Sequence, residues 1–367
     1  MRHIDRFTAS LMRAHVTNKA KLRTINTIIR KARSHLRPDL RIHSPAMHKY
    51  KIYHNPAYML IIPRIMRENK DNKQTIHIIA GPTASGKSAR AIELCEELDG
   101  IIINCDSMQI YDGLQTLTAQ PPAEDLARAP HMLYSHIHPN DTCSAGNWRE
   151  IVEPIIHDVL NQGKAPIIVG GSGLYIRALT DGLSPMPDVP QEIRDAAVKK
   201  QEELGNPAFH AELQKRDPIM AERFHPFHTA RLVRAWEVLE ATGKSLAEWQ
   251  TLTRSAPPEE WDFQIEVIIP ERPVQHQRCN DRFLWMMDNG ILDEVEAFSK
   301  RIESGELREN VALVKSLGYR PLLSYIKGEI SKDDAITQSQ ARTRQYAKQQ
   351  VTWFRNQILN TKKDAPT

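Results

Sequence analysis

The sequence is poor in cysteine and has no long apolar run. Its four cysteines, among 367 residues, are scattered and form no C-x-x-C pair. This excludes a disulfide framework and a cysteine-based zinc knuckle, and it favours reduced thiols in the cytoplasm. No apolar stretch approaches the roughly 20 residues that a membrane-spanning helix needs. We therefore expect a cytoplasmic protein without a membrane span, and nothing in the sequence demands more than a monomer.

Acidic residues are scarce in the first 65 positions, where only Asp5 and Asp39 accompany fourteen lysines and arginines. The rest of the chain is net acidic, so all the excess positive charge lies in this segment. Three interpretations remain open: an RNA-binding arm, a basic transit peptide, or an over-extended start in which Met66 opens the working protein. We expect residues 1–65 to be disordered or not to belong to the working enzyme.

The segment GPTASGKS, residues 81–88, matches the phosphate-binding pattern G-x-x-x-x-G-K-[ST]. In this pattern, backbone N–H groups, the lysine and the final hydroxyl surround a phosphate and its magnesium ion. A predicted buried strand, Ile76–Ala80, precedes the loop, and a predicted helix, Ala89–Leu98, follows it. Strand, loop and helix are the context that the pattern requires, so we expect a phosphate to bind here.

Two further buried strands are predicted at Ile101–Asn104 and Ile167–Val169, with a helix near Trp148–Leu160 between them. Strands that alternate with helices indicate a parallel, doubly wound sheet, whose ligands gather at the carboxyl ends of the strands. The phosphate-binding loop, Asp106 and Ser172 all follow such ends. We therefore expect them to face one crevice.

Prolines enclose a helical block in the second half of the chain. The segment LSPMPDVP, residues 183–190, lies at one end of the block, and Ala-Pro-Pro at 256–258 lies at the other. We therefore predict a catalytic core made of residues 75–186 and 259–360, interrupted by a helical insertion domain over residues 187–258.

The loop alone first suggests a small-molecule or nucleotide kinase, with Asp106 as the carboxylate that holds magnesium. However, arginines are spread over the separate motifs ARLVRA, HQRCNDR, LGYR and RTRQYAKQQ, and no arginine-rich lid is recognisable. Such a spread is typical of a wide surface that meets many phosphates, as in nucleic-acid binding. Prenyl transfer to free adenine nucleotides and non-catalytic RNA binding are further alternatives.

Eight segments, in this order and spacing, resemble the tRNA dimethylallyltransferases of bacterial type, the adenosine isopentenyltransferase family. The segments are GPTASGKS, DSMQIYDGLQTLTAQP, APHMLYSHI, VGGSGLYIRAL, DGLSPMP, HP followed by ARLVRAWEV, LGYRPLLSYIKGEIS and TRQYAKQQVTWFR. The resemblance covers about residues 75–358 and leaves the N-terminal segment out. One loop motif is a weak signal, whereas eight ordered motifs are a strong one.

The resemblance implies a P-loop NTPase-like α/β fold and a loop that holds dimethylallyl diphosphate in place of ATP. The implied reaction moves the dimethylallyl group to N6 of the adenosine at position 37 of tRNA, next to the anticodon, and releases diphosphate. Magnesium, held by Ser88, would neutralise the charge that builds on the leaving group. The residues expected at the diphosphate are Gly81, Thr83, Ala84, Ser85, Gly86, Lys87, Ser88 and Arg278.

Two residues are candidates for catalysis. The acceptor amine attacks weakly until it loses a proton, because its lone pair is delocalised into the adenine ring. Asp106 matches the aspartate that is taken to be the base in the family, and we expect it to be the general base here; a helix N-cap or a magnesium ligand is the alternative. Ser172 stands where the family usually has threonine. We expect its hydroxyl to bind around the reacting centre, although a simple turn serine is the alternative.

The resemblance also maps tRNA contacts onto the chain, and the target base must leave its stack to be reached. The expected contacts are Asp106, Ser107, Met108, Gln109, Ser172, Arg194, Ala230, Arg231, Leu232, Val233, Arg234, Lys315, Ser316, Leu317, Gly318, Tyr319 and Arg320. The helical insertion domain, residues 187–258, is expected to contact the tRNA. For any one of the arginines, a surface salt bridge is the alternative. Arg278 and Arg282 are open between diphosphate and RNA backbone. Gln120 replaces a lysine that is frequent in the family, which puts a phosphate contact there in doubt.

Overall fold

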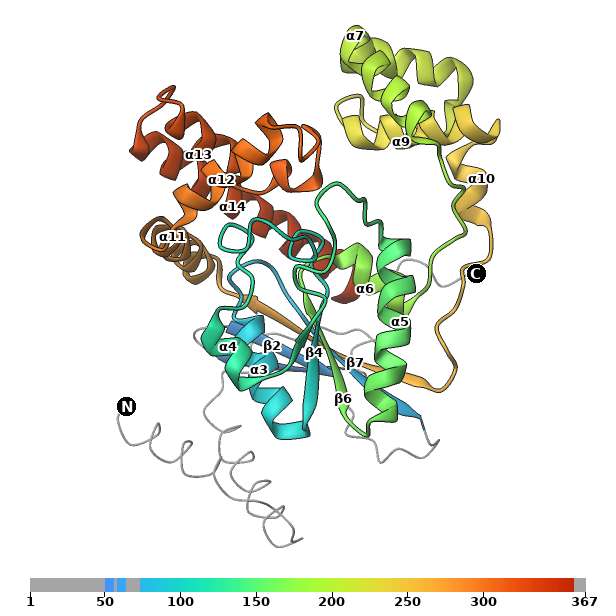
Figure 1. Ribbon diagram of the computed structural model, residues 1–367. Helices are drawn as coiled ribbons and strands as arrows, with labels where there is room; N and C mark the ends of the chain where they lie inside the picture. Colours follow the sequence, from blue (N-terminus) through green and yellow to red (C-terminus); the bar gives the residue numbers. More distant parts are fainter. Residues whose placement is uncertain (1–49, 56–57, 64–72, 360–367) are drawn as a thin grey trace, which may run out of the picture. The chain divides into compact units, whose positions relative to one another are not determined.

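The structure, a computed structural model, describes residues 50–55, 58–63 and 73–359 (Figure 1). The chain divides into the units Met1–Met47 and His48–Thr367, and all the described residues belong to the second. Its strands are β1 Tyr50–Asn55, β2 Tyr58–Pro63, β3 Gln74–Ala80, β4 Gly100–Asn104, β5 His131–Met132, β6 Ala165–Gly170 and β7 Trp261–Pro270. Its helices are α3 Lys87–Leu98, α4 Ala123–Arg128, α5 Ala145–Asn161, α6 Gly173–Thr180, α7 Gln191–Arg216, α8 Pro218–Arg223, α9 Thr229–Thr242, α10 Leu246–Thr251, α11 Arg272–Asp288, α12 Ile291–Glu303, η2 Ala312–Lys315, α13 Tyr319–Ile326, α14 Lys332–Phe354 and η3 Arg355–Leu359. None of these described helices is long and apolar enough to cross a membrane.

The described strands form one sheet in the order β1-β2-β7-β3-β6-β4-β5. The five from β7 to β5 are parallel, and β3 lies between β7 and β6. Their carboxyl ends therefore share one edge of the sheet, which is where parallel sheets bind ligands. The predicted parallel sheet flanked by helices is confirmed.

The central strands are apolar without alternation because both faces of the sheet are covered. Ile78 of β3 and Ile103 of β4 pack in the larger core, with α5, α6 and helices from the C-terminal part. Their neighbours Ile79 and Ile102 pack in a second core, which includes residues of α3. Successive residues of one strand thus enter two different cores, which accounts for the apolar runs Ile101–Ile103 of β4 and Ile167–Val169 of β6.

Strands β1 and β2 lie within residues 1–65, the segment that was expected to be disordered or not to belong to the working enzyme. They pair with each other antiparallel, and β2 then pairs antiparallel with β7, for example Leu60 with Ile268. The run MLII in β2 has the β-branched, apolar composition of a strand, but its basic surroundings concealed that signal. An unpaired edge of β7 would expose a row of backbone N–H and C=O groups, and β2 satisfies them. The expectations for residues 1–49 lie outside the described residues.

Helices α7 to α10 form a core of their own, built on side chains such as Phe209, Leu232 and Trp236. The segment that leads out of these helices is joined to the segment that leads into them, since the N–H of Ser255 donates to the carbonyl oxygen of Leu183 at 3.1 Å. Arg149 of α5 holds the outgoing segment. Its guanidinium donates to the carbonyl oxygens of Ser255 at 2.6 Å and Ala256 at 3.1 Å. The helices lie within the range 187–258 that was predicted for the insertion, whose contact with tRNA stays a prediction.

Leu232 is fully buried in this insertion core. Replacing it with alanine removes apolar contacts and leaves a cavity, so Leu232→Ala is expected to lower the free energy of unfolding by about 2–5 kcal/mol. Urea denaturation followed by circular dichroism measures the change. Ala230→Ser, at an exposed position two residues away, should stay within about 0.5 kcal/mol of the parent. Equal stability of both variants would contradict the placement of Leu232 in the core.

Candidate active site

Glycines give the phosphate-binding loop, residues 81–88, its shape. Gly86 has a φ of +92°, where any side chain would be strained, and it stands at the N-cap of α3. A Cβ atom on Gly81 would lie 2.5 Å from the carbonyl oxygen of Ile268, so only glycine fits there. The free N–H groups at the start of α3 carry the positive end of the helix dipole, which suits an anion.

Helix α14, far along the chain, pins this loop through Gln350. The side-chain oxygen of Gln350 accepts the N–H of Thr83 at 2.9 Å, and its Nε2 donates to the carbonyl oxygen of Gly171 at 3.0 Å. Gln350 is buried. Burial removes the water that would otherwise bind the Gln350 amide, the N–H of Thr83 and the carbonyl oxygen of Gly171. The two hydrogen bonds of Gln350 replace that water. One side chain thus fixes both the loop and the turn that leads into α6.

Helix α11 covers the loop with a second set of donors. Gln275 donates to the carbonyl oxygen of Thr83 and Arg278 to that of Ser85, both at 3.3 Å, and the guanidinium of Arg282 donates to the Thr83 hydroxyl. The spacing of Gln275, Arg278 and Arg282 puts them on one helix face. Both arginines whose partners were left open in the sequence therefore lie against the loop.

Lys87 is enclosed by these elements, so its charged form is costly. Burial lowers the pKa of Lys87 to about 8, the charge of Asp106 opposes this shift, and Arg282 adds to it. Burial also lowers the pKa of Arg282, whereas Cys279 and Asp106 raise it. Two cations thus share an enclosed site with one carboxylate. An anionic ligand would neutralise the excess positive charge.

Asp106 follows β4 in a turn that its neighbours hold in place. The side-chain oxygen of Asn104 accepts the N–H of Asp106 at 2.9 Å, and Oδ1 of Asp106 accepts the N–H of Met108 at 3.0 Å. Oγ of Ser172 accepts the N–H of Ser107 at 2.9 Å. The structure therefore brings Asp106, Ser172 and the phosphate-binding loop to the carboxyl ends of neighbouring strands, where the charge of Asp106 acts on Lys87 and Ser172 supports the turn that carries Asp106.

Comparison with known proteins shows which family the chain belongs to. The sequence model described as IPP transferase matches residues 109–357. The tRNA dimethylallyltransferase of Paramagnetospirillum magneticum is 45% identical over 282 residues, which are 77% of this chain and 88% of that protein. The chain belongs to the IPP transferase family. The tRNA dimethylallyltransferase of Rhodospirillum centenum is similar at 43% identity, over 79% of this chain and 91% of that one.

Solved structures of this family have the same fold. A eukaryotic dimethylallyltransferase acting on tRNA matches with a TM-score of 0.61 and 26% identity, over 77% of this chain and 70% of its own. The full-length tRNA isopentenylpyrophosphate transferase of Bacillus halodurans matches with a TM-score of 0.52 and 29% identity, over 78% of this chain and 88% of its own. The resemblance seen in the sequence motifs is confirmed.

The tRNA contacts that the family resemblance predicts beyond the crevice lie on separate elements. Arg194 is on α7, residues 230–234 open α9, and residues 315–320 join η2 to α13. The side chains of Leu232 and Tyr319 are buried in the two cores. They cannot present their side chains to RNA, so exposed neighbours in each segment would have to make the contacts.

The sequence did not predict that Gln275, Gln350 and Asn104 hold the site in place. The position of Gln350 in its helix nevertheless indicated a buried polar side chain. Gln350 follows Ala347 by three positions and precedes Phe354 by four, so it lies on the buried stripe of α14. A polar residue at such a position needs a hydrogen-bonding partner. Nothing in the sequence indicated that the partners would be the loop and Gly171.

Gln120, where the family often has lysine, is fully engaged within its own segment. Its Nε2 donates to the carbonyl oxygen of Tyr111 at 3.1 Å, and its side-chain oxygen accepts the hydroxyl of Ser135 at 2.9 Å. The side chain therefore braces this segment and brings no charge to a phosphate.

Gln350→Leu should leave the N–H of Thr83 and the carbonyl oxygen of Gly171 without their partner. Each buried, unsatisfied group costs about 1–3 kcal/mol, so the free energy of unfolding should fall by at least that amount. Chemical denaturation measures it, with Gln349→Leu as the control at an exposed neighbouring position. If the two variants unfold alike, Gln350 does not hold the loop.

Proposed function

We propose that this chain transfers the dimethylallyl group of dimethylallyl diphosphate to N6 of the adenosine at position 37 of tRNA, next to the anticodon. The observation that carries the proposal is the enclosed site in which the charge of Asp106 acts on the two buried cations Lys87 and Arg282. The relatives of the family are named for this transfer to tRNA. A cationic cradle suits the leaving diphosphate, and a carboxylate beside it suits an acceptor that must lose a proton.

The diphosphate would occupy the phosphate-binding loop. Its donors would be the backbone N–H groups of residues 84 and 86–88, the ammonium of Lys87 and the guanidinium groups of Arg278 and Arg282, since the N–H groups of Thr83 and Ser85 are already bound within the chain. The hydroxyl of Ser85 supports this assignment, because it is buried and has no hydrogen-bonding partner among the described residues. A buried hydroxyl without a partner is costly, and a ligand oxygen within the loop would satisfy it.

The loop also fits a magnesium ion. Ser88 is exposed at the start of α3, and its hydroxyl is the group that holds Mg²⁺ in loops of this pattern. Mg²⁺ prefers oxygen ligands and is commonly held by few protein groups together with substrate phosphates, as this site would provide. When bound, the ion would neutralise charge on the leaving diphosphate.

Asp106 would act as the general base. As the C–O bond to diphosphate breaks, N6 of adenine forms a bond to the allylic carbon, and its proton passes to the carboxylate of Asp106. Because Oδ1 of Asp106 already accepts the N–H of Met108, Oδ2 is the oxygen left for this proton. The bond from Ser172 to Ser107 would keep the carboxylate in place. The cations around the loop would stabilise the charge on the departing diphosphate.

The tRNA would be gripped by basic side chains outside the crevice. Arg231 and Arg320 are exposed. Arg194 lines a pocket of about 390 Å³ together with Arg308, and its buried Nε has no partner among the described residues. A guanidinium N–H without a partner suits a backbone phosphate; Asp141 and Asp195 line the same pocket. Arg234 pairs with Glu237 at 2.6 Å, so it is less available.

The alternatives of a kinase and of a free-nucleotide prenyltransferase are not favoured, because the family acts on tRNA by name and a free nucleotide needs no such dispersed arginines. Salt separates them: tRNA held through several phosphates should bind much more weakly as salt rises, whereas a free nucleotide should not. The cytoplasmic location and monomeric state stay predictions.

Incubation with unmodified tRNA, Mg²⁺ and radiolabelled dimethylallyl diphosphate tests the function. The parent chain should label the tRNA. Asp106→Asn, which can still accept the N–H of Met108, should lose about 10²–10⁴-fold in rate while still binding tRNA in a filter assay. Full activity of the variant would refute Asp106 as the base. Turnover of ATP without labelled tRNA would refute the transferase.

The lowered pKa of Lys87 predicts a pH dependence of binding. Since the pKa lies near 8 in the free chain, Lys87 loses its proton above that pH and attracts diphosphate less. Calorimetric affinity for dimethylallyl diphosphate without tRNA should therefore fall by up to about tenfold per pH unit above 8. Lys87→Arg keeps its charge in this range, so its affinity should stay flat. Parallel declines in both chains would assign the effect to another group.

A further inference from the structure

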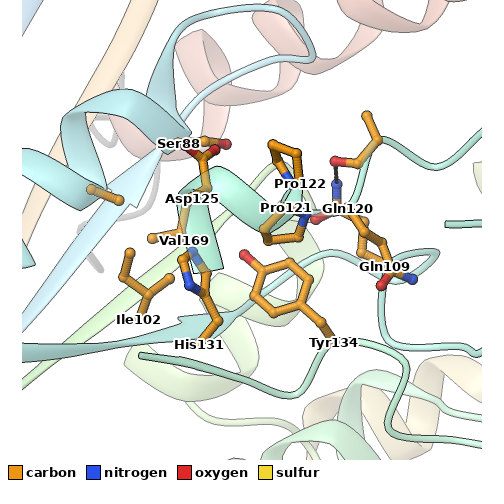
Figure 2. A pocket seen from close by; sticks show the side chains of 12 residues that line it. Ser88, Ile102, Gln109, Gln120, Pro121, Pro122, Asp125, His131, Tyr134 and Val169 are labelled. Carbon is orange, nitrogen blue, oxygen red and sulfur yellow. Dashed lines mark hydrogen bonds between the residues drawn. The ribbon is translucent and has the colours of Figure 1, made fainter. Parts of the chain in front are cut away.

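A small polar pocket lies beside Ser88, on the side of the loop where α3 and α4 are in contact (Figure 2). Its volume is about 60 Å³. A water molecule needs roughly 10–15 Å³ of such volume, so the pocket has room for about four waters and for no nucleotide base. The polar side chains that line it are Ser88, Gln109, Gln120, Asp125, His131 and Tyr134.

The ring of His131 and the amide of Gln109 have only acceptor atoms left for this pocket. Nδ1 of His131 lies 2.8 Å from the carbonyl oxygen of Ala129. A carbonyl can only accept, so Nδ1 carries the hydrogen and Nε2 is bare; burial lowers the pKa of His131 and favours this neutral form. Nε2 of Gln109 donates to the carbonyl oxygens of Thr118 and Ala119, which leaves its side-chain oxygen.

Asp125 adds a negative charge without a counter-ion. It contributes the single carboxylate among the residues that line the pocket. Within the described part of the chain, it forms no ion pair, and Arg128 on the same helix is bound instead to Glu96 at 2.9 Å. The pocket therefore combines a carboxylate, a ring nitrogen and an amide oxygen, all of which seek donors.

We propose that this pocket holds water molecules of the divalent cation bound at Ser88, and that Asp125 orients them. The inference rests on the proposed function, which brings the cation in with the diphosphate. A cation-bound water coordinates through its oxygen, so both its hydrogens point outward and need acceptors. Mg²⁺ keeps several of its waters and is typically held through one or two carboxylates and substrate phosphates. Asp125 touches those waters and not the substrate, so it is a positioning residue.

Asp106 does not fill this role. It does not line the pocket, one of its oxygens accepts the N–H of Met108, and its charge acts on Lys87 and Arg282. The two carboxylates thus have different roles. Asp106 accepts the proton of the acceptor nitrogen, and Asp125 orients the water molecules of the metal.

Asp125→Asn in the full chain tests the inference through metal binding itself. Mn²⁺ stands in for Mg²⁺, and its binding is followed by electron paramagnetic resonance in the presence of inorganic diphosphate. Loss of an outer-shell carboxylate should weaken Mn²⁺ binding by about 10–100-fold, while diphosphate binding measured without metal stays unchanged. Asp125→Glu should recover part of the affinity. Glu124→Gln, at the exposed neighbouring position, should bind Mn²⁺ like the parent.

Equal Mn²⁺ affinity of Asp125→Asn and the parent would overturn the inference. If Asp125→Asn melts at a lower temperature than the parent, Asp125→Glu decides: no better Mn²⁺ binding than the asparagine variant would also overturn it. The labelling experiment tests the proposed function independently of this inference. A parent chain that leaves tRNA unlabelled, yet binds Mn²⁺ in an Asp125-dependent way, would refute the transferase and keep the metal assignment.

Discussion

The unbalanced positive charge around Lys87 is the constraint on which the rest of the site depends. Lys87 and Arg282 share an enclosed space with the single carboxylate of Asp106. Removing two cations from water costs free energy, and the packing of α11 and α14 over the loop offsets that cost. The site is therefore organised before any ligand arrives. An entering anion finds its donors already dehydrated and aimed, which is the condition under which electrostatic stabilisation is strongest.

The two sides of the loop present different groups. On the side of α11, the groups that reach the loop are N–H donors, which suit the oxygens of a leaving anion. On the side of α4, Asp125, Gln109 and His131 offer acceptors beside the hydroxyl groups of Ser88 and Tyr134, and these acceptors suit the hydrogens of metal-bound water. In the proposed reaction, the turn after β4 would present Asp106 to the acceptor adenine. Such an arrangement would keep the proposed general base away from the metal, which would otherwise compete for the same carboxylate.

Local features were predictable from the sequence, and distant ones were not. The strand, loop and helix around residues 81–88 follow from a short pattern and from apolar runs, because each depends on neighbours in sequence. The burial of the side chains of Leu232 and Tyr319 could not be foreseen, since a motif gives a segment but not the direction in which each side chain points. Gln350 was missed for a third reason. Its partners lie 267 and 179 positions away, and no local rule couples such positions.

The long reach of Gln350 has a consequence for biosynthesis. Its partner Thr83 leaves the ribosome long before it, and the loop cannot take its final shape until α14 has emerged and docked. Contacts of such sequence separation form late, because the entropy of closing the intervening chain must be overcome first. The sheet and its first helices can therefore assemble during translation around an unfinished loop. A nascent chain would be largely folded before α14 docks, and the proposed diphosphate site would be complete only after Gln350 has reached the loop.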